Sequence, residues 1–368
     1  MKIMLLAGAH DIHTVRWANK LCENGNEIHL CYVSNHMPSV NKYNREVFLH
    51  KLKIPAPYGY YLNIFQLRKL ISVIQPDILN AHYSSGYGTL GRLSKFSPYL
   101  LSVYGSDVYS FPYQKKLNMK IIRKNLNAAN AIASTSYAMA VQTSRLTNIN
   151  VEKIYITPFG VDTIKFCKKD LVRKDDSIIL GTIKKLAPKY GIEYGIKAVD
   201  YLIKNLLYGK NHTKKIKYYI YGDGPQKEEL KSLVKELNLE EVIFFKGRIP
   251  NDEVPTALNE FDIFLGTSIS DSESFGVAIV EAMACEVPVI VTDVDGFKEV
   301  VDNGNAGIMV PRKDYIEMAK QIFRLLNNDA LRKEIGKAER SRVIEYYNWD
   351  DNVRKMETIY KDLISQNK

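Results

Sequence analysis

The sequence of 368 residues predicts an α/β protein built from two doubly wound domains that face a central cleft. Three observations support this prediction. The length favours two domains, short apolar strands alternate with helices, and a charged segment divides this alternation into two halves. Such alternation is typical of a parallel sheet covered by helices on both faces. Functional residues are therefore expected at the carboxyl ends of the strands.

The first half of the chain contains five predicted strands. They are Lys2–Leu6, Glu27–Val33, Asp77–Ala81, Tyr99–Val103 and Ala131–Ser134. Apolar residues at helical spacing predict helices over Thr14–Glu23 and Leu62–Ile74, and Pro76 separates the second helix from the next strand.

The charged stretch FCKKDLVRKDD, Phe166–Asp176, loses apolar periodicity and is predicted to be a linker. The alternation then restarts. Further strands are expected at Ser177–Ile183, Ile216–Tyr221, Val242–Phe245, Phe261–Leu265 and Val287–Thr292. Helices are expected at Gly191–Leu206, Gln226–Glu236 and Phe275–Cys285.

The composition indicates a globular chain, since 46% of residues are hydrophobic and 25% are charged. A net charge of +10 suits nucleic acid, an anionic membrane or phosphorylated substrates as partners. The four cysteines show no CxxC pairing, which argues against zinc and disulfides and fits a reducing compartment. The first apolar run is too short for a signal peptide, and no uncharged apolar run reaches membrane-spanning length. We therefore expect a cytoplasmic protein.

Two glutamates bracket a mostly apolar stretch, SESFGVAIVEAMACEVPVIVTD. Glu273 is expected in the loop before a helix and Glu281 on its second turn, roughly 9–12 Å apart along the axis. The amides of Phe275, Gly276 and Val277 lie between them at the positive end of the helix, which makes an anion site flanked by carboxylates. A nucleotide sugar, with its diphosphate between two hydroxyl-bearing sugars, would fit this arrangement.

A structural explanation of the same residues is also open. Acidic side chains near a helix start are favourable without any ligand, so Glu273 alone is weak evidence. Asp271, Ser272 and Ser274 are expected to cap this helix. Glu281 is harder to explain structurally, because its helix offers little polar surface and a buried unpaired carboxylate is costly.

Polar residues also cluster where other predicted strands end. They are His82; Gly105, Ser106 and Asp107; Lys184 and Lys189; and Gly222, Asp223 and Gly224. Each of these residues could simply favour a turn, but their shared position at the carboxyl ends of the strands in both predicted sheets favours ligand binding.

Two motifs are interpreted as coincidental. Gly86, Gly88 and Gly91 match GxGxxG, but they follow a later strand, whereas the dinucleotide fingerprint belongs to the first strand of a domain. Asp293-Val294-Asp295 matches a metal-binding DxD. Without a nearby histidine or third carboxylate, we interpret it as a strand end and helix cap, and we expect no metal.

The segment SISDSESFGVAIVEAMACEVPVIVTDVDGFKEVV resembles the signature of retaining glycosyltransferases of family four, which have the GT-B fold. Their E-x7-E motif matches Glu273 and Glu281. TPFGVD, YGDGP, FFKGRIP, AHYSSGYG, YGSDV and YNWDDNVRKMETIYKDL resemble other segments of the family, so the resemblance covers nearly the whole chain. It implies two Rossmann-like domains, an acceptor-side domain at 1–165 and a donor-binding domain at 177–348, with 166–176 between them. The last helix, about 349–368, would return to the first domain.

The resemblance implies roles for matching donor-site residues. Glu281 would bind the ribose hydroxyls, Glu273 the donor sugar, and Lys189 the diphosphate. Lys184 stands where the family usually has arginine, and a lysine cannot form the bidentate fork. The remaining donor-side residues implied by the resemblance are His82, Phe275, Gly276, Val277, Arg248, Ile249 and Gly222, of which His82 would touch the sugar and Arg248 and Ile249 the base.

On the acceptor side, the resemblance implies His13, Gly105, Ser106 and Asp107. The loop GAHDIHT departs from the family, because it has one glycine where a glycine-rich loop is common. The expected function is retaining, metal-independent sugar transfer without a cofactor, from a nucleotide sugar, with UDP as the expected nucleotide. The expected acceptor is a glycan or lipid-linked molecule in bacterial surface polysaccharide assembly. A nucleotide-sugar epimerase of the same fold is the alternative.

The segment Tyr109–Lys124 mixes aromatic rings with lysines and arginines. This pattern suits an anionic membrane interface, and a solvated basic helix explains it equally well. We expect peripheral contact with the inner face of the cell membrane and no binding of nucleic acid.

Overall fold

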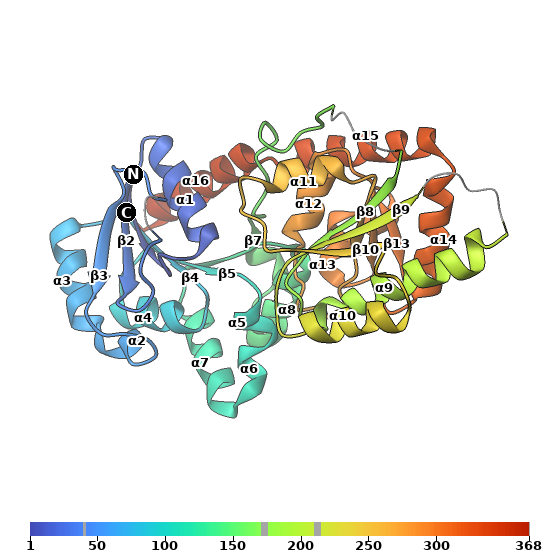
Figure 1. Cartoon of the computed structure of the whole chain (residues 1–368). Helices are drawn as coiled ribbons and strands as arrows, with labels where there is room; N and C mark the ends of the chain where they lie inside the picture. Colours follow the sequence, from blue (N-terminus) through green and yellow to red (C-terminus); the bar gives the residue numbers. More distant parts are fainter. Residues whose placement is uncertain (40–41, 171–175, 210–214, 368) are drawn as a thin grey trace. The chain divides into compact units, whose positions relative to one another are not determined.

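The computed structural model describes residues 1–39, 42–170, 176–209 and 215–367. The chain forms two compact units, the first comprising Met1–Phe159 with the chain from Asp350 onward, and the second Gly160–Trp349. Each unit is built around one sheet in which all paired strands run parallel (Figure 1). This architecture confirms the predicted α/β class with two doubly wound domains.

The sheet of the first unit has the order β3-β2-β1-β4-β5-β6-β7. Its strands are β1 (Lys2–Leu6), β2 (Glu27–Val33), β3 (Phe48–Leu52), β4 (Ile78–His82), β5 (Tyr99–Val103), β6 (Ala131–Ser134) and β7 (Ile154–Ile156). The central strands β1, β4 and β5 are almost wholly buried, as expected for a sheet covered on both faces. The order reverses between β1 and β4, which is where ligands of such sheets bind.

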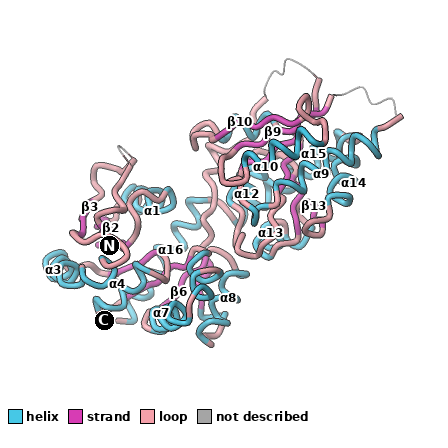
Figure 2. The backbone as a smooth tube through the Cα atoms, turned by 60° about the horizontal axis from the view of Figure 1, so that its bottom comes forward, coloured by secondary structure: helices cyan, strands magenta, loops and turns pink. Residues whose placement is uncertain are grey.

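The helices of this unit cover both faces of its sheet (Figure 2). They are α1 (Ile12–Glu23), α2 (Gly59–Leu62), α3 (Ile64–Ile74), α4 (Gly86–Ser94), α5 (Ser106–Tyr109), α6 (Phe111–Gln114), α7 (Lys116–Asn127), α8 (Tyr137–Thr147) and α16 (Trp349–Gln366), with a 3-10 turn η1 (Val151–Lys153). The last helix packs on this unit, where Asn80 Nδ2 donates to Tyr360 Oη at 2.7 Å.

Four strands of this unit have the predicted bounds, and two edge strands were missed. β3 is mostly exposed and lacks a buried apolar run, and β7 has only three residues. The GxGxxG glycines lie on α4 and serve close packing. A Cβ on Gly86 would lie 2.3 Å from the Tyr60 ring, and one on Gly91 would lie 2.7 Å from Tyr99.

The sheet of the second unit has the order β10-β9-β8-β11-β12-β13. Its strands are β8 (Ile178–Ile183), β9 (Ile216–Tyr221), β10 (Ile243–Gly247), β11 (Ile263–Gly266), β12 (Val289–Thr292) and β13 (Ile308–Val310). Its α-helices are α9 (Ile192–Tyr201), α10 (Lys227–Glu236), α11 (Val254–Glu260), α12 (Val277–Ala284), α13 (Asp295–Val300), α14 (Tyr315–Leu326) and α15 (Asp329–Tyr346). Shorter turns are η2 (Pro188–Tyr190), the π-helix η3 (Leu202–Leu207) and η4 (Asp302–Gly304).

The second unit begins earlier than the predicted linker. Val161 pairs with Asn348, and Val161 N donates to the Tyr347 carbonyl at 2.7 Å, so the chain joins this unit directly after Phe159. Part of the predicted linker, residues 171–175, lies outside the described residues. The helix predicted to reach Leu206 leaves α-geometry after Tyr201 and continues as a π-helix. Within the described ranges, no helix is both long and apolar enough to cross a bilayer.

Candidate functional site

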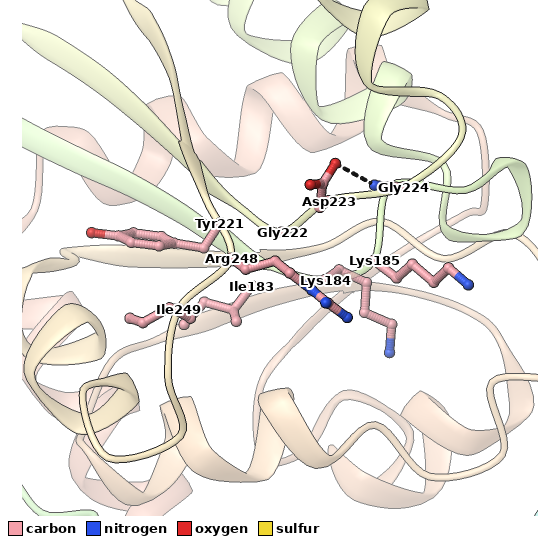
Figure 3. A pocket seen from close by; sticks show the side chains of 9 residues that line it. All are labelled: Ile183, Lys184, Lys185, Tyr221, Gly222, Asp223, Gly224, Arg248 and Ile249. Carbon is pink, nitrogen blue, oxygen red and sulfur yellow. Dashed lines mark hydrogen bonds between the residues drawn. The ribbon is translucent and has the colours of Figure 1, made fainter. Parts of the chain in front are cut away.

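A pocket of about 530 Å³ opens where β8, β9 and β10 end (Figure 3). Its lining is Ile183, Lys184, Lys185, Tyr221, Gly222, Asp223, Gly224, Arg248 and Ile249. The structure thus brings together Lys184, Gly222, Arg248 and Ile249, which the sequence proposed separately. Lys185, Tyr221 and the Asp223 side chain were not given donor-site roles.

Two glycines of this pocket allow one backbone segment to approach another closely. Gly222 has φ +143, and a Cβ there would lie 1.8 Å from the Lys184 carbonyl oxygen. A Cβ on Gly224 would lie 2.1 Å from the Leu186 carbonyl oxygen. Only glycine fits where backbones approach this closely, so the β9 loop can lie against the loop that carries Lys184.

Two lysines and a carboxylate converge beside the pocket. Lys184 Nζ lies 2.5 Å from Glu273 Oε2, and the Glu273 side chain is only 12% exposed. Both lysines contact Tyr190: Lys184 Nζ lies 4.6 Å and Lys189 Nζ 4.8 Å from the ring centre. Contact with the face of the Tyr190 ring stabilises the two ammonium groups and restricts their positions. Tyr190 was not identified from the sequence.

Helix α12 begins differently from the prediction. Its N-cap is Gly276, at φ +86, and no side chain of the described residues caps it. The expected capping by Asp271, Ser272 and Ser274 is therefore wrong. The positive φ of this N-cap favours glycine, which has no side chain that could accept a hydrogen bond from the first amides of the helix. Of the three predicted amides, that of Val277 belongs to the first residue of the helix and that of Gly276 to its N-cap, whereas Phe275 precedes the cap.

Asp271 instead belongs to a clamp built around Arg312. The guanidinium Nη1 and Nη2 donate to the two Asp271 carboxylate oxygens at 3.1 and 3.0 Å. The Nε and the backbone N of Arg312 donate to Asp293 Oδ1 at 3.1 and 2.8 Å. Hydrogen bonds from Arg312 lower the pKa values of both carboxyls, against the effect of burial. The clamp ties the loop that carries Glu273 to the ends of β12 and β13.

The same clamp accounts for the DxD motif. Asp293 follows β12 and is bound by Arg312, whereas Asp295 lies in the first turn of α13, 3.6 Å from Lys298 Nζ. The N-cap of α13 is Val294, so the predicted aspartate cap is wrong. Arg312 stands 19 residues from Asp293 and 41 from Asp271, so no local pattern could have identified it.

Gly296 packs closely against the backbone of the loop that carries Glu273. A Cβ at Gly296 would lie 2.3 Å from the Glu273 carbonyl oxygen and 2.6 Å from the Phe275 nitrogen. The first turn of α13 therefore packs directly against the backbone of residues 273–275. Glu281 is partly buried on α12, one turn beyond Val277, which matches its predicted place on the second turn.

In the first unit, two histidines lie at the carboxyl edge of the sheet. His82 ends β4 and is buried, and burial lowers its pKa to about 4. His13 lies on the first turn of α1, stacked 3.9 Å from the Phe159 ring, and burial lowers its pKa to about 4 as well. Both imidazoles are therefore neutral at pH 7. Asp11, which caps α1 through the His13 amide at 2.8 Å, is the carboxylate that most favours their protonation.

The candidate acceptor-side residues divide into two kinds. Asp107 is buried and accepts four hydrogen bonds, from the amides of Ser84, Tyr104 and Gly105 and from the Ser84 hydroxyl, at 2.7–3.2 Å. Both its oxygens are thus engaged in holding the loop. Gly105, at φ +128, turns the chain into α5, and Ser106 is exposed on its first turn. A direct contact of these residues with an acceptor stays a prediction.

Comparison with known proteins defines the class to which this geometry belongs. Residues 164–342 match the family model described as glycosyl transferases group 1, and residues 2–136 match the one described as glycosyl transferase 4-like. One match falls in each structural unit, and together they span most of the chain. The chain is a glycosyltransferase of the two-domain, Rossmann-like GT-B class.

Individual relatives agree with this class. The chain is 26% identical over 362 residues to N-acetyl-alpha-D-glucosaminyl L-malate synthase of Bacillus anthracis, covering 95% of this chain and 92% of that protein. It is also 26% identical over 241 residues to poly(ribitol-phosphate) alpha-N-acetylglucosaminyltransferase of Staphylococcus aureus, covering 65% of this chain and 45% of that protein. The structure of Anabaena HepE in complex with UDP-glucose superposes with a TM-score of 0.78 at 16% identity, over 99% of this chain and 100% of that chain. That last likeness shows the fold alone.

Proposed function

We propose that this glycosyltransferase moves a sugar from a nucleoside diphosphate onto an acceptor hydroxyl, without a metal and with retention of anomeric configuration. The observation that carries the proposal is the set of contacts made by Lys184, which lines the pocket at the ends of β8–β10. It pairs with Glu273, shares the Tyr190 ring with Lys189, and lines a second, smaller cavity together with Gly276 and Ala278 at the start of α12. A diphosphate needs concentrated positive charge, and lysines with helix amides supply it.

The chemistry of each part of this site supports a position for the donor. The pocket lined by Arg248 and Ile249 takes the base, Glu281 the ribose hydroxyls, and the two lysines the diphosphate. UDP is the proposed nucleotide, supported by the neighbour of the same fold whose structure holds UDP-glucose. No cofactor is proposed.

The Lys184–Glu273 ion pair gives donor binding a specific consequence. With its oxygen 2.5 Å from the ammonium group, Glu273 already occupies the position from which Lys184 would meet a phosphate. A bound diphosphate competes for Lys184, and this frees the Glu273 carboxylate to accept hydrogen bonds from donor-sugar hydroxyls. Donor binding and sugar recognition are thereby coupled through one ion pair.

The reaction conserves charge and atoms without a protein nucleophile. The acceptor oxygen forms a bond to the anomeric carbon as the bond from that carbon to the diphosphate oxygen breaks. A donor phosphate oxygen takes the hydroxyl proton, and attack from the leaving-group face retains the configuration. Lys184, Lys189 and the α12 amides stabilise the growing charge of the departing diphosphate. Both enzyme relatives are named for alpha-linked sugars, which supports retention.

A glycan or a lipid-linked molecule of bacterial surface polysaccharide assembly is the proposed acceptor, and the cytoplasm the proposed location. One relative is named for a poly(ribitol-phosphate) acceptor, which supports a polymeric acceptor. The neutral imidazoles of His13 and His82 suit hydroxyl-rich groups better than anions, because neither carries a positive charge at pH 7. The epimerase alternative receives no support from the matches, which name glycosyltransferases.

Purified protein tests the proposal directly. Thermal shift across UDP-, GDP- and other nucleotide sugars identifies the donor, since a bound ligand stabilises the native state. The chosen donor is then incubated with glycan acceptors, and NMR of the product reads the anomeric configuration. We expect transfer with the donor configuration kept. Inversion would overturn the same-face mechanism, and interconversion of the donor without transfer would establish an epimerase.

A further inference from the structure

Residues 47–151 carry a charge imbalance that the sugar-transfer site does not explain. This segment contains twelve lysines and arginines but only two acidic residues, Asp77 and Asp107. Its net charge of +10 equals that of the whole chain. Asp107 is buried and engaged by four hydrogen bonds, and Asp77 accepts from the Lys2 amide at 2.7 Å.

These cations keep their charge exposed to solvent. Eleven of the twelve are exposed, the exception being the half-buried Arg92. Across the parts of the chain that the structure describes, every ion pair lies outside residues 47–151. An uncompensated patch of this sign attracts a polyanionic partner.

Large apolar side chains are exposed among the same helices. They are Tyr58, Tyr61, Leu62, Phe65, Tyr113 and Leu117. Phe65 is 78% and Leu117 65% exposed. Soluble polyanions such as nucleic acid offer little to bury an aliphatic side chain, whereas a bilayer interface buries apolar groups and attracts cations together.

Cations and apolar groups share the same exposed stripes of two helices. On α3, Phe65, Lys69 and Val73 follow one another at four-residue spacing. On α7, Leu117, Lys120 and Lys124 are spaced by three and four residues. Residues at these spacings lie on one face of a helix, so each helix presents a mixed apolar and basic stripe.

The helices involved are neighbours on one side of the first unit. α4 packs against α2, α3 and α7, and α6 packs against α7. Figure 1 draws α2, α4, α6 and α7 along the lower side of this unit, with α1 and α16 along its upper side. The aromatic segment expected to contact a membrane is only partly on this surface, since Tyr109 and Phe111 pack against the core and Tyr113 is exposed.

We propose that the surface formed by α2–α3 and α6–α7 docks onto an anionic lipid bilayer. It would insert Tyr58, Leu62, Phe65 and Leu117 among the headgroups, while the lysines and arginines meet lipid phosphates. The inference deepens the proposed function by naming the surface that would bring the enzyme to a lipid-linked acceptor, and its physical basis does not depend on the donor site.

Vesicle flotation of the full-length protein tests this docking without donor or acceptor. We expect binding to phosphatidylcholine vesicles that contain phosphatidylglycerol, and little binding to phosphatidylcholine alone. Binding should weaken between about 0.1 M and about 1 M salt, where the screening length falls from about 10 to about 3 Å. Equal binding to neutral vesicles, or none to anionic vesicles at low salt, would overturn the proposal.

Two matched pairs of variants locate the surface. Lys116→Gln/Lys120→Gln should lower vesicle affinity by at least about tenfold, given about 1 kcal/mol per lysine near an anionic surface. Lys355→Gln/Lys361→Gln, on exposed positions of α16, should leave it unchanged. Phe65→Ser should lower affinity by roughly tenfold through lost apolar burial, and Ile164→Ser, which is 85% exposed in the second unit, should not.

Binding to heparin tests the alternative that this surface recognises a soluble polyanion. Capture by heparin that is independent of Phe65, with no vesicle binding, would show that the surface recognises a soluble polyanion and would overturn the membrane assignment. Transfer to a soluble acceptor is measured separately on the same variants. A failure of docking with transfer intact leaves the proposed function standing, and docking without transfer would count against the function alone.

Discussion

At the scale of single residues, the candidate donor site contains two lysines whose ammonium groups are positioned by a carboxylate and an aromatic ring. Lys184 is shared between the Glu273 carboxylate and the Tyr190 ring, and Lys189 meets the same ring. Lys184 offers a point charge at the position where the family resemblance implies an arginine in most members, and contact with the Tyr190 ring restricts where that charge can lie. Substitutions at these positions should therefore separate binding from turnover.

Glu281→Ala should lower the affinity for UDP by about tenfold or more, because it removes the carboxylate proposed to accept hydrogen bonds from two ribose hydroxyls. The helix should survive, since alanine favours helices. Calorimetric titration with UDP measures the change, with Glu334→Ala, at an exposed position of α15, as the control. Unchanged affinity in folded Glu281→Ala protein would rule out the ribose contact.

Lys189→Ala should reduce kcat by about a hundredfold and donor affinity much less, since the charge it meets grows as the diphosphate departs. Lys184→Arg should keep most of the rate, because arginine also meets the phosphate. Steady-state kinetics separates kcat from KM, with Lys231→Ala on α10 as a surface control. If both Lys184 and Lys189 can be neutralised at full rate, the site lies elsewhere.

His82 makes the stability of the first unit sensitive to acid. Its pKa is lowered from 6.5 to about 4 by burial, so below pH 6.5 the unfolded chain binds a proton that the native state does not. Stability should thus be fully retained above pH 6.5 and fall toward pH 4, by up to about 1.4 kcal/mol per pH unit.

His82→Gln removes this proton linkage. Thermal unfolding midpoints between pH 4 and pH 7 should depend less steeply on pH in this variant than in the wild type. His10→Gln, at an exposed position, is the matched control and should keep the wild-type slope. Equal slopes in all three proteins would mean that His82 is not kept neutral by the fold.

At the scale of elements, the loop between β11 and α12 is held from two sides. Arg312 ties Asp271 to the ends of β12 and β13, and Gly296 lets α13 press against residues 273–275. Glu273 lies two residues beyond Asp271, so the direction of its carboxylate depends on this clamp. We infer that Arg312 is a positioning residue for the donor site.

Arg312→Gln should increase hydrogen exchange in residues 267–276 and leave β8–β10 protected as before. Because small misplacement of a catalytic group is costly, kcat should fall by about tenfold or more, with UDP affinity nearly unchanged. Arg312→Lys should recover part of the rate, and Arg324→Gln on α14 is the surface control. A parallel loss of kcat and UDP affinity would indicate general damage to the unit.

At the scale of the whole molecule, the fold class predicts whether protein cations or a metal ion neutralise the charge of the diphosphate. A transferase of the other common fold, GT-A, would use DxD carboxylates and a divalent ion for this purpose. Here Asp293 is bound by Arg312, and the cations that line the pocket at the ends of β8–β10 are Lys184, Lys185 and Arg248. The two units therefore support the proposal that the protein supplies the positive charge itself.

Transfer should accordingly persist in excess EDTA at an unchanged rate. Initial rates with and without chelator measure this, and added magnesium or manganese should not raise them. Loss of activity that is restored by either ion would make Asp293 and Asp295 candidates for metal ligands, despite the Arg312 pair. It would contradict the metal-independent mechanism and leave the α/β architecture as observed.

The sequence alone determined the parts of this protein that local patterns encode. Strands β1, β2, β5, β6 and β9 were predicted with their observed bounds, because buried parallel strands are short apolar runs between turn residues. Polar residues and glycines after predicted strands identified Lys184 and Gly222 of the pocket, whereas Arg248 and Ile249 were identified only through the family resemblance.

Only the tertiary structure decided which of these groups meet. The Lys184–Glu273 pair spans 89 positions of the chain, and the Arg312 clamp joins residues 19 and 41 positions apart. The start of α12 was mispredicted for the same reason. Asp271 has the chemistry of a cap, but a distant arginine binds it more strongly than a nearby amide would. Local sequence patterns predict secondary structure. Ion pairs between residues far apart in the sequence depend instead on distances in space, which the packing of strands and helices around the sheet determines.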